Sequence, residues 1–222
     1  MLPLNIIYQY FRSQKHCAVL LSLLFILITA STISSAEVIA TNAEDIAPIL
    51  IGQELPSLVL KDANDKNFDL NKAVAQKPTL LIFYRGGWCP YCNTHLSELR
   101  KIEASLLAMG FQIIAISPDR PKFLQESMES NKLGYQLLSD SNMATSKALG
   151  LAYTVDSETL KKFDHYGIDI EKNAGQNHRL LPVPAALLVN TKGKVTFTFV
   201  APNYKTRISN GLIMAAAEAQ LE

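Results

Sequence analysis

A continuous apolar run followed by a glycine break and a helical pattern most constrains the fold of this chain. Residues Thr79 to Tyr84 read Thr-Leu-Leu-Ile-Phe-Tyr, without the polar alternation of a strand that has one wet face. Gly86 and Gly87 then interrupt the run. Leucine and isoleucine recur at helical spacing from Asn93 to Met109, and Gly110 follows as a C-terminal cap. The pattern predicts a buried central strand, a tight turn and a helix.

The same alternation of strand and helix signals continues toward the C-terminus. The expected strands are Phe111–Ser117, Tyr135–Leu138, Ala185–Val189 and Val195–Val200, and the expected helices are Arg120–Asn131, Asn142–Leu149 and Ile208–Leu221. The last two strands flank a turn with Gly193, which predicts a hairpin. Strands alternating with helices are typical of a parallel sheet with right-handed crossovers. We therefore expect an α/β fold with a central mixed β-sheet flanked by helices.

Three further segments complete this description. Two short strands within Leu55–Asp62 and Phe68–Leu70 surround a polar turn and predict an N-terminal β-hairpin. Residues Asn42–Leu50 form a lead-in or a short helix. Between Leu151 and Pro182 the periodic signals weaken, which indicates a long polar insertion near the site of action.

The size and charge of the chain bound its organisation and its partners. Its 222 residues suit one ordinary domain with a short extra segment. A formal net charge of +1 provides no field that would gather nucleic acid or an anionic membrane, so we expect no nucleic-acid partner. Three cysteines are too few for a disulfide-stapled scaffold.

The first residues resemble an export signal. Arg12, Lys15 and His16 precede an apolar run from Cys17 to Ala30, which is shorter than the ~20 residues of a spanning helix. Small residues up to Ala36 fit a signal-peptidase site, so residues 1–36 are interpreted as a signal peptide, with an uncleaved anchor as the alternative. Residues 37–50 are then the lead-in and 51–222 the domain. Either reading places the domain outside the cytosol, in the periplasm or secreted, with membrane contact only if cleavage does not occur.

The chemistry is expected at Trp88-Cys89-Pro90-Tyr91-Cys92, where the predicted strand ends and the helix starts. Backbone N–H groups and the helix dipole stabilise an anion there, and a thiolate is such an anion. Cysteines three residues apart lie on one helical face, one turn from each other. The competing readings are a static disulfide and half of a zinc site, but no second cysteine pair accompanies His95, His165 and His178, and we expect no metal.

Several spaced motifs together resemble a known family. They read Ile51-Gly-Gln-Glu-Leu-Pro, Leu60-Lys-Asp, Leu81-Ile-Phe-Tyr-Arg-Gly-Gly-Trp-Cys-Pro-Tyr-Cys-Asn, Ile114-Ala-Ile-Ser-Pro-Asp and Leu138-Ser-Asp. From Ile51 onward the chain is similar to the peroxiredoxin-like branch of the AhpC/TSA (alkyl hydroperoxide reductase and thiol-specific antioxidant) family. The resemblance implies a thioredoxin-like fold with an N-terminal hairpin and an antioxidant enzyme that reduces peroxides. It also implies no cofactor and an external thiol reductant.

The resemblance leaves the identity of the attacking cysteine open. Peroxiredoxins carry Thr or Ser three residues before the peroxidatic cysteine, which places Cys89 at the Thr and makes Cys92 the nucleophile. In thioredoxins the first cysteine attacks, which would be Cys89. The buried acid of thioredoxins falls at Phe83, so the sequence shows no carboxylate at that position.

The resemblance also nominates supporting residues. Pro184 resembles the cis-proline that thioredoxins place against their cysteine pair, at the position where peroxiredoxins carry an arginine. Arg85 or Arg179 is a candidate to replace that arginine. Trp88 is expected to shield the thiolate or to cover the sheet edge, while Tyr91 should be exposed. His95 is read as a helix-surface residue rather than an acid–base catalyst.

Two other functions remain open at this point. The first is a thiol-disulfide oxidoreductase that acts on exported proteins through a mixed disulfide and uses the same two cysteines. The second is a non-enzymatic metal-binding or partner-binding module. An arginine within reach of the thiolate would favour the peroxidase. An open apolar groove beside Pro184 would favour the oxidoreductase.

Overall fold

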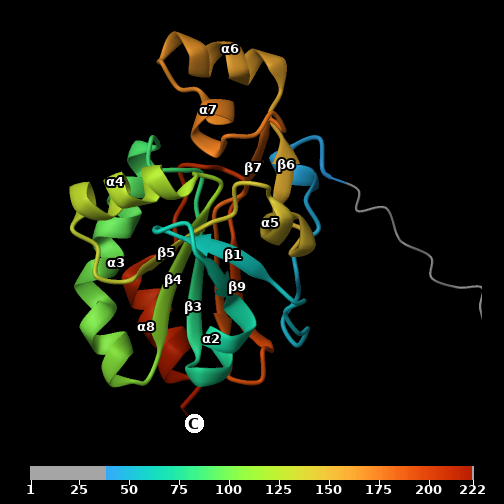
Figure 1. Cartoon of the computed structure of the whole chain (residues 1–222). Coiled ribbons are helices and arrows are strands. Elements are labelled where there is room, and N and C mark those ends of the chain that lie inside the picture. The colour runs from blue at the N-terminus through green and yellow to red at the C-terminus, as the bar shows by residue number, and fades with distance from the viewer. Residues whose placement is uncertain (1–38, 222) are drawn as a thin grey trace, which may run out of the picture. The chain divides into compact units, whose positions relative to one another are not determined.

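The computed structural model describes residues 39–221, which lie within one compact unit. Within the described residues a seven-stranded sheet has the order β2-β1-β5-β4-β3-β8-β9 (Figure 1). Strand β3 (Thr79–Phe83) lies inside this sheet, between β4 and β8, and every one of its side chains is buried. Strand β3 runs parallel to β4 (Gln112–Ser117) and antiparallel to β8 (Ala185–Val189). The expected α/β class with a mixed sheet is therefore confirmed.

The remaining strands extend the sheet on both sides. On one side β5 (Gln136–Ser139) pairs in parallel with β4, and on the other β9 (Val195–Val200) forms the expected hairpin with β8. The N-terminal hairpin is also present, with β1 (Val59–Asp62) antiparallel to both β2 (Asn67–Asp69) and β5.

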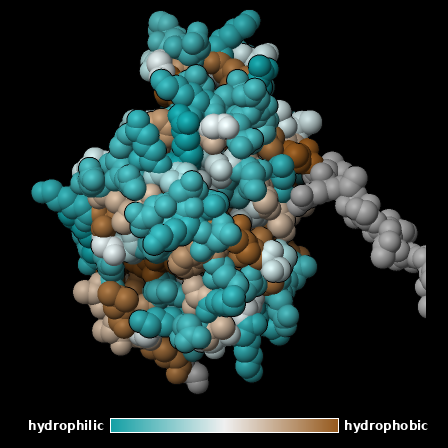
Figure 2. Space-filling model, viewed as in Figure 1, coloured by the Kyte–Doolittle hydropathy of each residue, from teal (hydrophilic) through white to brown (hydrophobic). Residues whose placement is uncertain are grey.

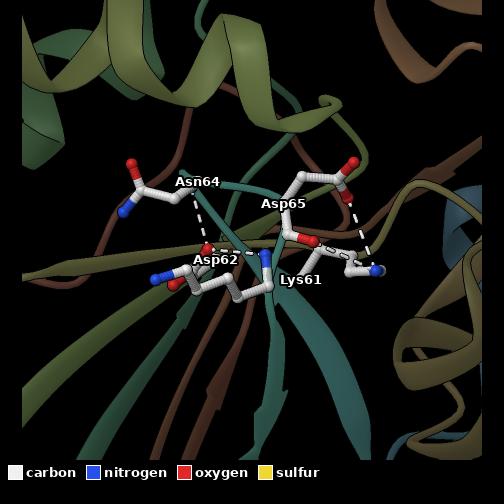
Figure 3. Close-up of polar contacts among 5 residues, drawn as sticks. Lys61, Asp62, Asn64 and Asp65 are labelled. Carbon is white, nitrogen blue, oxygen red and sulfur yellow. Dashed lines mark hydrogen bonds and ion pairs between the residues drawn. The ribbon is translucent and has the colours of Figure 1, made fainter.

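Asp62 closes the turn of the N-terminal hairpin. Its Oδ1 accepts hydrogen bonds from the backbone N–H groups of Asn64 and Lys66, at 2.8 and 2.9 Å. Figure 3 shows this turn together with the exposed ion pair between Lys61 and Asp65. Asp65 adopts a positive φ of 61°, which short polar residues tolerate in turns. The polar sequence between the two strands is thus accounted for by local hydrogen bonding.

Helices cover both faces of the sheet because neighbouring residues of each strand point to opposite sides. Leu80, Ile82 and Tyr84 face α3 (Pro90–Ala108), α4 (Pro121–Asn131) and α8 (Asn210–Glu218). Leu81 and Phe83 face the other layer, which includes α2 (Leu70–Gln76) and the end of α5 (Ala144–Ala148). This double burial explains why β3 is apolar at every position.

The segment expected as a polar insertion contains regular structure. It consists of β6 (Ala152–Thr154), α6 (Ser157–His165), α7 (Ile170–Ala174) and β7 (Leu180–Pro182), with β6 and β7 paired antiparallel as a separate sheet. In Figure 1 the two helices lie beyond the ends of the strands of the main sheet, near the start of α3, and Figure 2 shows mostly hydrophilic residues over them. Asp156 and Asp169 cap the two helices by accepting N–H groups of Thr159 and Lys172.

The lead-in packs onto the domain as a short 3-10 helix, η1 (Ala43–Asp45), and an extended stretch whose Ile49 N–H donates to the Leu149 carbonyl. No helix within residues 39–221 has the length and apolar character needed to cross a bilayer. The export signal expected over residues 1–36 lies outside the described residues.

Candidate active site

The turn between β3 and α3 is held by a buried carboxylate. Asp119, which follows the end of β4, accepts a hydrogen bond from the Gly87 N–H at 2.6 Å. The preceding Gly86 has a φ of 145°, and a Cβ there would lie 2.3 Å from Nε1 of Trp88. Only glycine therefore fits the turn that leads into Cys89. The predicted break at Gly86 and Gly87, between strand and helix, is confirmed.

Cys89 occupies the N-cap of α3, and Pro90 is the first residue of the helix. The backbone carbonyl of Cys89 accepts the N–H groups of Cys92 and Asn93. A hydrogen bond from the Cys92 thiol, then the Cys92 backbone N–H and the charges of Arg85 and Arg207, lower the pKa of Cys89 to about 6. Cys89 is therefore mostly a thiolate at neutral pH.

The second cysteine has the opposite electrostatics. Cys92 is fully buried, and burial together with the neighbouring Cys89 raises its pKa well above the ordinary range. Nη2 of Arg207 lies 3.2 Å from the Cys92 sulfur and opposes that rise. The two cysteines thus form a thiolate–thiol pair in which the proton resides on Cys92. Neither is in a disulfide in this structure.

Arg207 is the site residue that the sequence analysis missed. It lies in the loop between β9 and α8, and its Nη1 also donates to the carbonyls of Tyr204 and Thr206. No local motif marks it. Arg207 therefore brings a guanidinium to the cysteine pair from another part of the chain, since Pro184 occupies the position where peroxiredoxins carry an arginine.

Arg85, which follows β3 and precedes the glycine turn, lies against three aromatic rings. Its guanidinium carbon is 5.0 Å from the Trp88 ring centroid, 5.2 Å from that of Phe163 and 4.4 Å from that of Tyr204. The side chain is only 4% exposed, and its Nε has no hydrogen-bond partner among the described residues. Of the two candidate arginines, the structure brings Arg85 to the site. Arg179 instead pairs with Glu171 at 3.1 Å on an exposed surface.

A cavity of about 580 Å³ opens beside Cys89, and we call it the redox cavity. Its walls come from the start of α3, the α6 insertion, the β9–α8 loop and the lead-in. The lining side chains used below are Arg85, Trp88, Cys89, Tyr91, Phe163 and Tyr204. Tyr91 is 44% exposed, as expected, and its ring packs edge-on against Tyr204. The Trp88 ring packs against Phe163 of α6 at an interplanar angle of 59°, so it links the redox turn to the insertion.

Two expectations about supporting residues are wrong. No peptide bond within the described residues is cis, so Pro184 follows a trans bond; it joins β7 to β8, and its carbonyl accepts the Ala201 N–H of β9. His95 is buried rather than on the helix surface, because α8 packs against α3, and burial lowers its pKa to about 4. The imidazole is therefore neutral at physiological pH.

A buried acid does lie near the pair, although none is at Phe83. Burial raises the pKa of Asp119 to about 7, and the negative charge of Cys89 adds to this rise. The sequence analysis recognised the motif that contains Asp119, but it did not predict that Asp119 lies under the redox turn.

Among residues 39–221 no three potential metal ligands of the His, Cys, Asp and Glu types gather.

The sequence profile described as the AhpC/TSA family matches residues 51–198. This chain belongs to the AhpC/TSA family. Peroxiredoxin Bcp of Escherichia coli K12 is 27% identical over 104 residues, which is 47% of this chain and 66% of that protein. Chloroplastic peroxiredoxin Q of Populus jackii is 29% identical over 100 residues, covering 45% and 46% of the two chains. The matched stretch thus spans less than two thirds of each of these relatives.

Solved structures show the same fold for this AhpC/TSA member. Reduced Prx3 from Vibrio vulnificus, in complex with H2O2, has a TM-score of 0.64 at 21% identity, covering 78% of this chain and 99% of that one. The bacterioferritin comigratory protein of Xanthomonas campestris has a TM-score of 0.60 at 18% identity, covering 79% and 100%. The thioredoxin-like fold of the peroxiredoxins is thereby established for this chain.

Proposed function

We propose that this protein is a thiol peroxidase in which Cys89 attacks the peroxide and Cys92 resolves the product. The observation that carries the proposal is the thiolate at the N-cap of α3, with its pKa lowered to about 6, at the wall of a cavity in an AhpC/TSA chain. The relatives named as peroxiredoxins support the same chemistry.

The chemistry proceeds in two steps. The Cys89 thiolate attacks one peroxide oxygen, the O–O bond breaks, and the leaving oxygen takes a proton from water to give water or an alcohol. The Cys92 sulfur then attacks the Cys89 sulfenic acid, an S–S bond forms, and the sulfenic oxygen leaves as water with the Cys92 proton. The peroxide gains two electrons and the cysteine pair loses them. Arg207, 3.2 Å from the Cys92 sulfur, favours the thiolate needed for the second step.

Electrostatics and access favour Cys89 over Cys92 as the nucleophile. Cys92 carries the proton in the reduced pair, and no described cavity is lined by it. Cys89 lines the redox cavity and is stabilised as an anion by the helix start and by two arginines. In this proposal the first cysteine of the pair is therefore the nucleophile, as in thioredoxins, and not the second, as the peroxiredoxin pattern of a Thr three residues earlier would imply.

Protein disulfides are the less favoured substrates. Cys89 is 1% exposed and is reached through the redox cavity, which Pro184 does not line. A disulfide in a folded partner would have to enter that cavity, whereas a small peroxide enters without rearrangement. An external thiol is still needed to reset the oxidised pair.

Rapid mixing of the reduced protein with H2O2, followed by the fluorescence of Trp88, tests the peroxidase proposal. Trp88 is the one tryptophan of the chain and lines the redox cavity. We expect fast oxidation in the native protein and in Cys92→Ser, and none in Cys89→Ser. The reverse outcome for the two variants would assign the attack to Cys92. Oxidation no faster than that of a free thiol would refute peroxidase activity.

We also propose that residues 1–36 direct export and are removed before Glu37. The basic start, the apolar run and the small residues up to Ala36 support this. The test is expression of the full chain in a bacterium, followed by fractionation and determination of the mature N-terminus. A mature chain that begins at Glu37 in the periplasm is expected, whereas a full-length chain in the cytosol would refute export.

A further inference from the structure

Arg85 is a buried cation whose side chain lacks a carboxylate partner. None of the ion pairs formed within residues 39–221 includes it. Its guanidinium carbon lies 5.0, 5.2 and 4.4 Å from the ring centroids of Trp88, Phe163 and Tyr204, and its Nε has no hydrogen-bond partner among the described residues. Buried charges are ordinarily paired, since desolvation without a partner is costly. Arg85 is therefore suited to bind an anion.

In the reduced protein the Cys89 thiolate supplies part of that counter-charge, because Arg85 is one of the charges that lower the Cys89 pKa. Once Cys89 and Cys92 form a disulfide, this negative charge is gone. The other charged side chains that line the redox cavity have partners elsewhere or lie in solvent. Asp156 accepts hydrogen bonds from Thr159, Lys162 forms an ion pair with Glu158, and Glu44 is exposed. Arg85 is thus more attractive to an anion in the oxidised state than in the reduced state.

The redox cavity also has the size and lining for more than hydrogen peroxide. A volume of about 580 Å³ is typical of sites for small organic molecules. Aromatic side chains from α3, α6 and the β9–α8 loop provide flat apolar contact, and Arg85 provides paired N–H donors that suit a carboxylate. The ligand that fits is an organic anion with an apolar body.

From these observations we propose that the redox cavity binds a small thiol bearing a carboxylate, which reduces the Cys89–Cys92 disulfide while its carboxylate pairs with Arg85. This inference rests on the proposed redox role of the pair. It names the reductant class rather than the peroxide, because the oxidised state is the one that leaves Arg85 without its counter-charge.

The reduction balances with two molecules of thiol. The first thiolate attacks the Cys89 sulfur, the S–S bond breaks, and Cys92 leaves with the electron pair next to Arg207. The second thiolate attacks the sulfur of the bound thiol in the mixed disulfide. A disulfide of the two small thiols is released and Cys89 returns as a thiolate. The returning charge competes with the carboxylate for Arg85 and so favours release of the product.

Two thiols that differ only in the anion provide the test. The disulfide is first formed with diamide, and the protein is then mixed with 4-mercaptophenylacetate or with 4-mercaptobenzyl alcohol. Samples are quenched in acid, alkylated and weighed by mass spectrometry. We expect the carboxylated thiol to react about tenfold faster, as for a charge-assisted hydrogen bond made on binding. Because diamide sets the disulfide, the result does not depend on peroxidase activity.

Variants and a competitor identify the site. In Arg85→Gln the rate ratio of the two thiols is expected to fall to about one. Because the readout is a ratio, a general loss of reactivity that affects both thiols equally does not change it. Arg179→Gln, which removes an exposed arginine outside the cavity, should keep the native ratio. Phenylacetate, which has no thiol, should slow the carboxylated thiol in the native protein, a measurement that needs no variant.

Three outcomes would overturn the proposal. Equal rates for the two thiols in the native protein would exclude recognition of the carboxylate. A native ratio that persists in Arg85→Gln would place the recognition elsewhere. Phenylacetate that slows oxidation by H2O2 as strongly as it slows disulfide reduction would show that the anion site is not specific to the oxidised state.

Discussion

Replacing Cys92 by alanine removes the thiol that donates to the Cys89 sulfur, the largest cause of the lowered Cys89 pKa. A hydrogen bond to a charged group contributes about 1.5 to 3 kcal/mol, and one pKa unit corresponds to about 1.4 kcal/mol. The pKa of Cys89, about 6 in the native protein, should therefore rise by about one to two units in Cys92→Ala. At pH 6.5 the thiolate fraction then falls from about three quarters to roughly a tenth.

The assay is the pH dependence of alkylation by iodoacetamide, with the modified cysteine identified by mass spectrometry. Reactivity requires the thiolate, so it is lost as the pH falls through the pKa of Cys89. Cys92→Ser is the matched control, because its hydroxyl keeps a donor at the same position. An unchanged midpoint in Cys92→Ala, or alkylation at Cys92 rather than Cys89 in the native protein, would refute the assignment of the proton to Cys92.

Three further predictions concern residues around the pair and one distant turn. In Arg207→Met the resolving step should slow by about tenfold, so that dimedone traps more Cys89 sulfenic acid; unchanged trapping would exclude a role for Arg207. The raised pKa of Asp119, about 7 against an ordinary 3.8, stabilises the fold fully below pH 3.8 and progressively less up to pH 7. Across that range, denaturant titrations should show native stability falling relative to Asp119→Asn by at most roughly 4 kcal/mol, and a constant difference would contradict the burial argument. Gly150→Ala should lower the melting temperature more than Gly167→Ala: both glycines have positive φ, but only at position 150 would a Cβ meet backbone, 1.9 Å from the Ala47 carbonyl oxygen, and equal losses would refute the clash.

Local patterns were sufficient to predict most of the main sheet. The apolar run of β3 is continuous because both faces of that strand are covered, and the leucine spacing of α3 follows from its one buried face. The two cysteines were also predictable, since the strand, the glycine turn and the helix start are adjacent in sequence. What lies within one strand-turn-helix unit is encoded locally.

The partners of the pair could not be predicted because they arrive from distant elements. Arg207 is 115 residues from Cys92, and its contact depends on the path of the chain after β9. Asp119 reaches the redox turn because β3 and β4 pair in parallel with Phe83 opposite Ile116, which brings the end of β4 beside Gly87. The spacing of residues along the sequence does not reveal this strand register.

The insertion was underestimated for a different reason. Its helices α6 and α7 are short and contain few apolar residues, and the N-cap residues Asp156 and Asp169, which could have marked the helix starts, were not recognised as caps. His95 was misread because its burial comes from α8, which packs across α3.

The paired strands β6 and β7 close the insertion at its base, separate from the main sheet. The segment between them contributes Phe163 and Tyr166 to the cavity wall but no strand to the central sheet and no cysteine. Part of the apolar cavity wall is thus encoded apart from the redox pair, whereas Arg85 and Trp88 lie in the same stretch as the cysteines. An insertion of another sequence, joined at the same two strands, would make a chimaera with altered ligand preference around an unaltered redox pair.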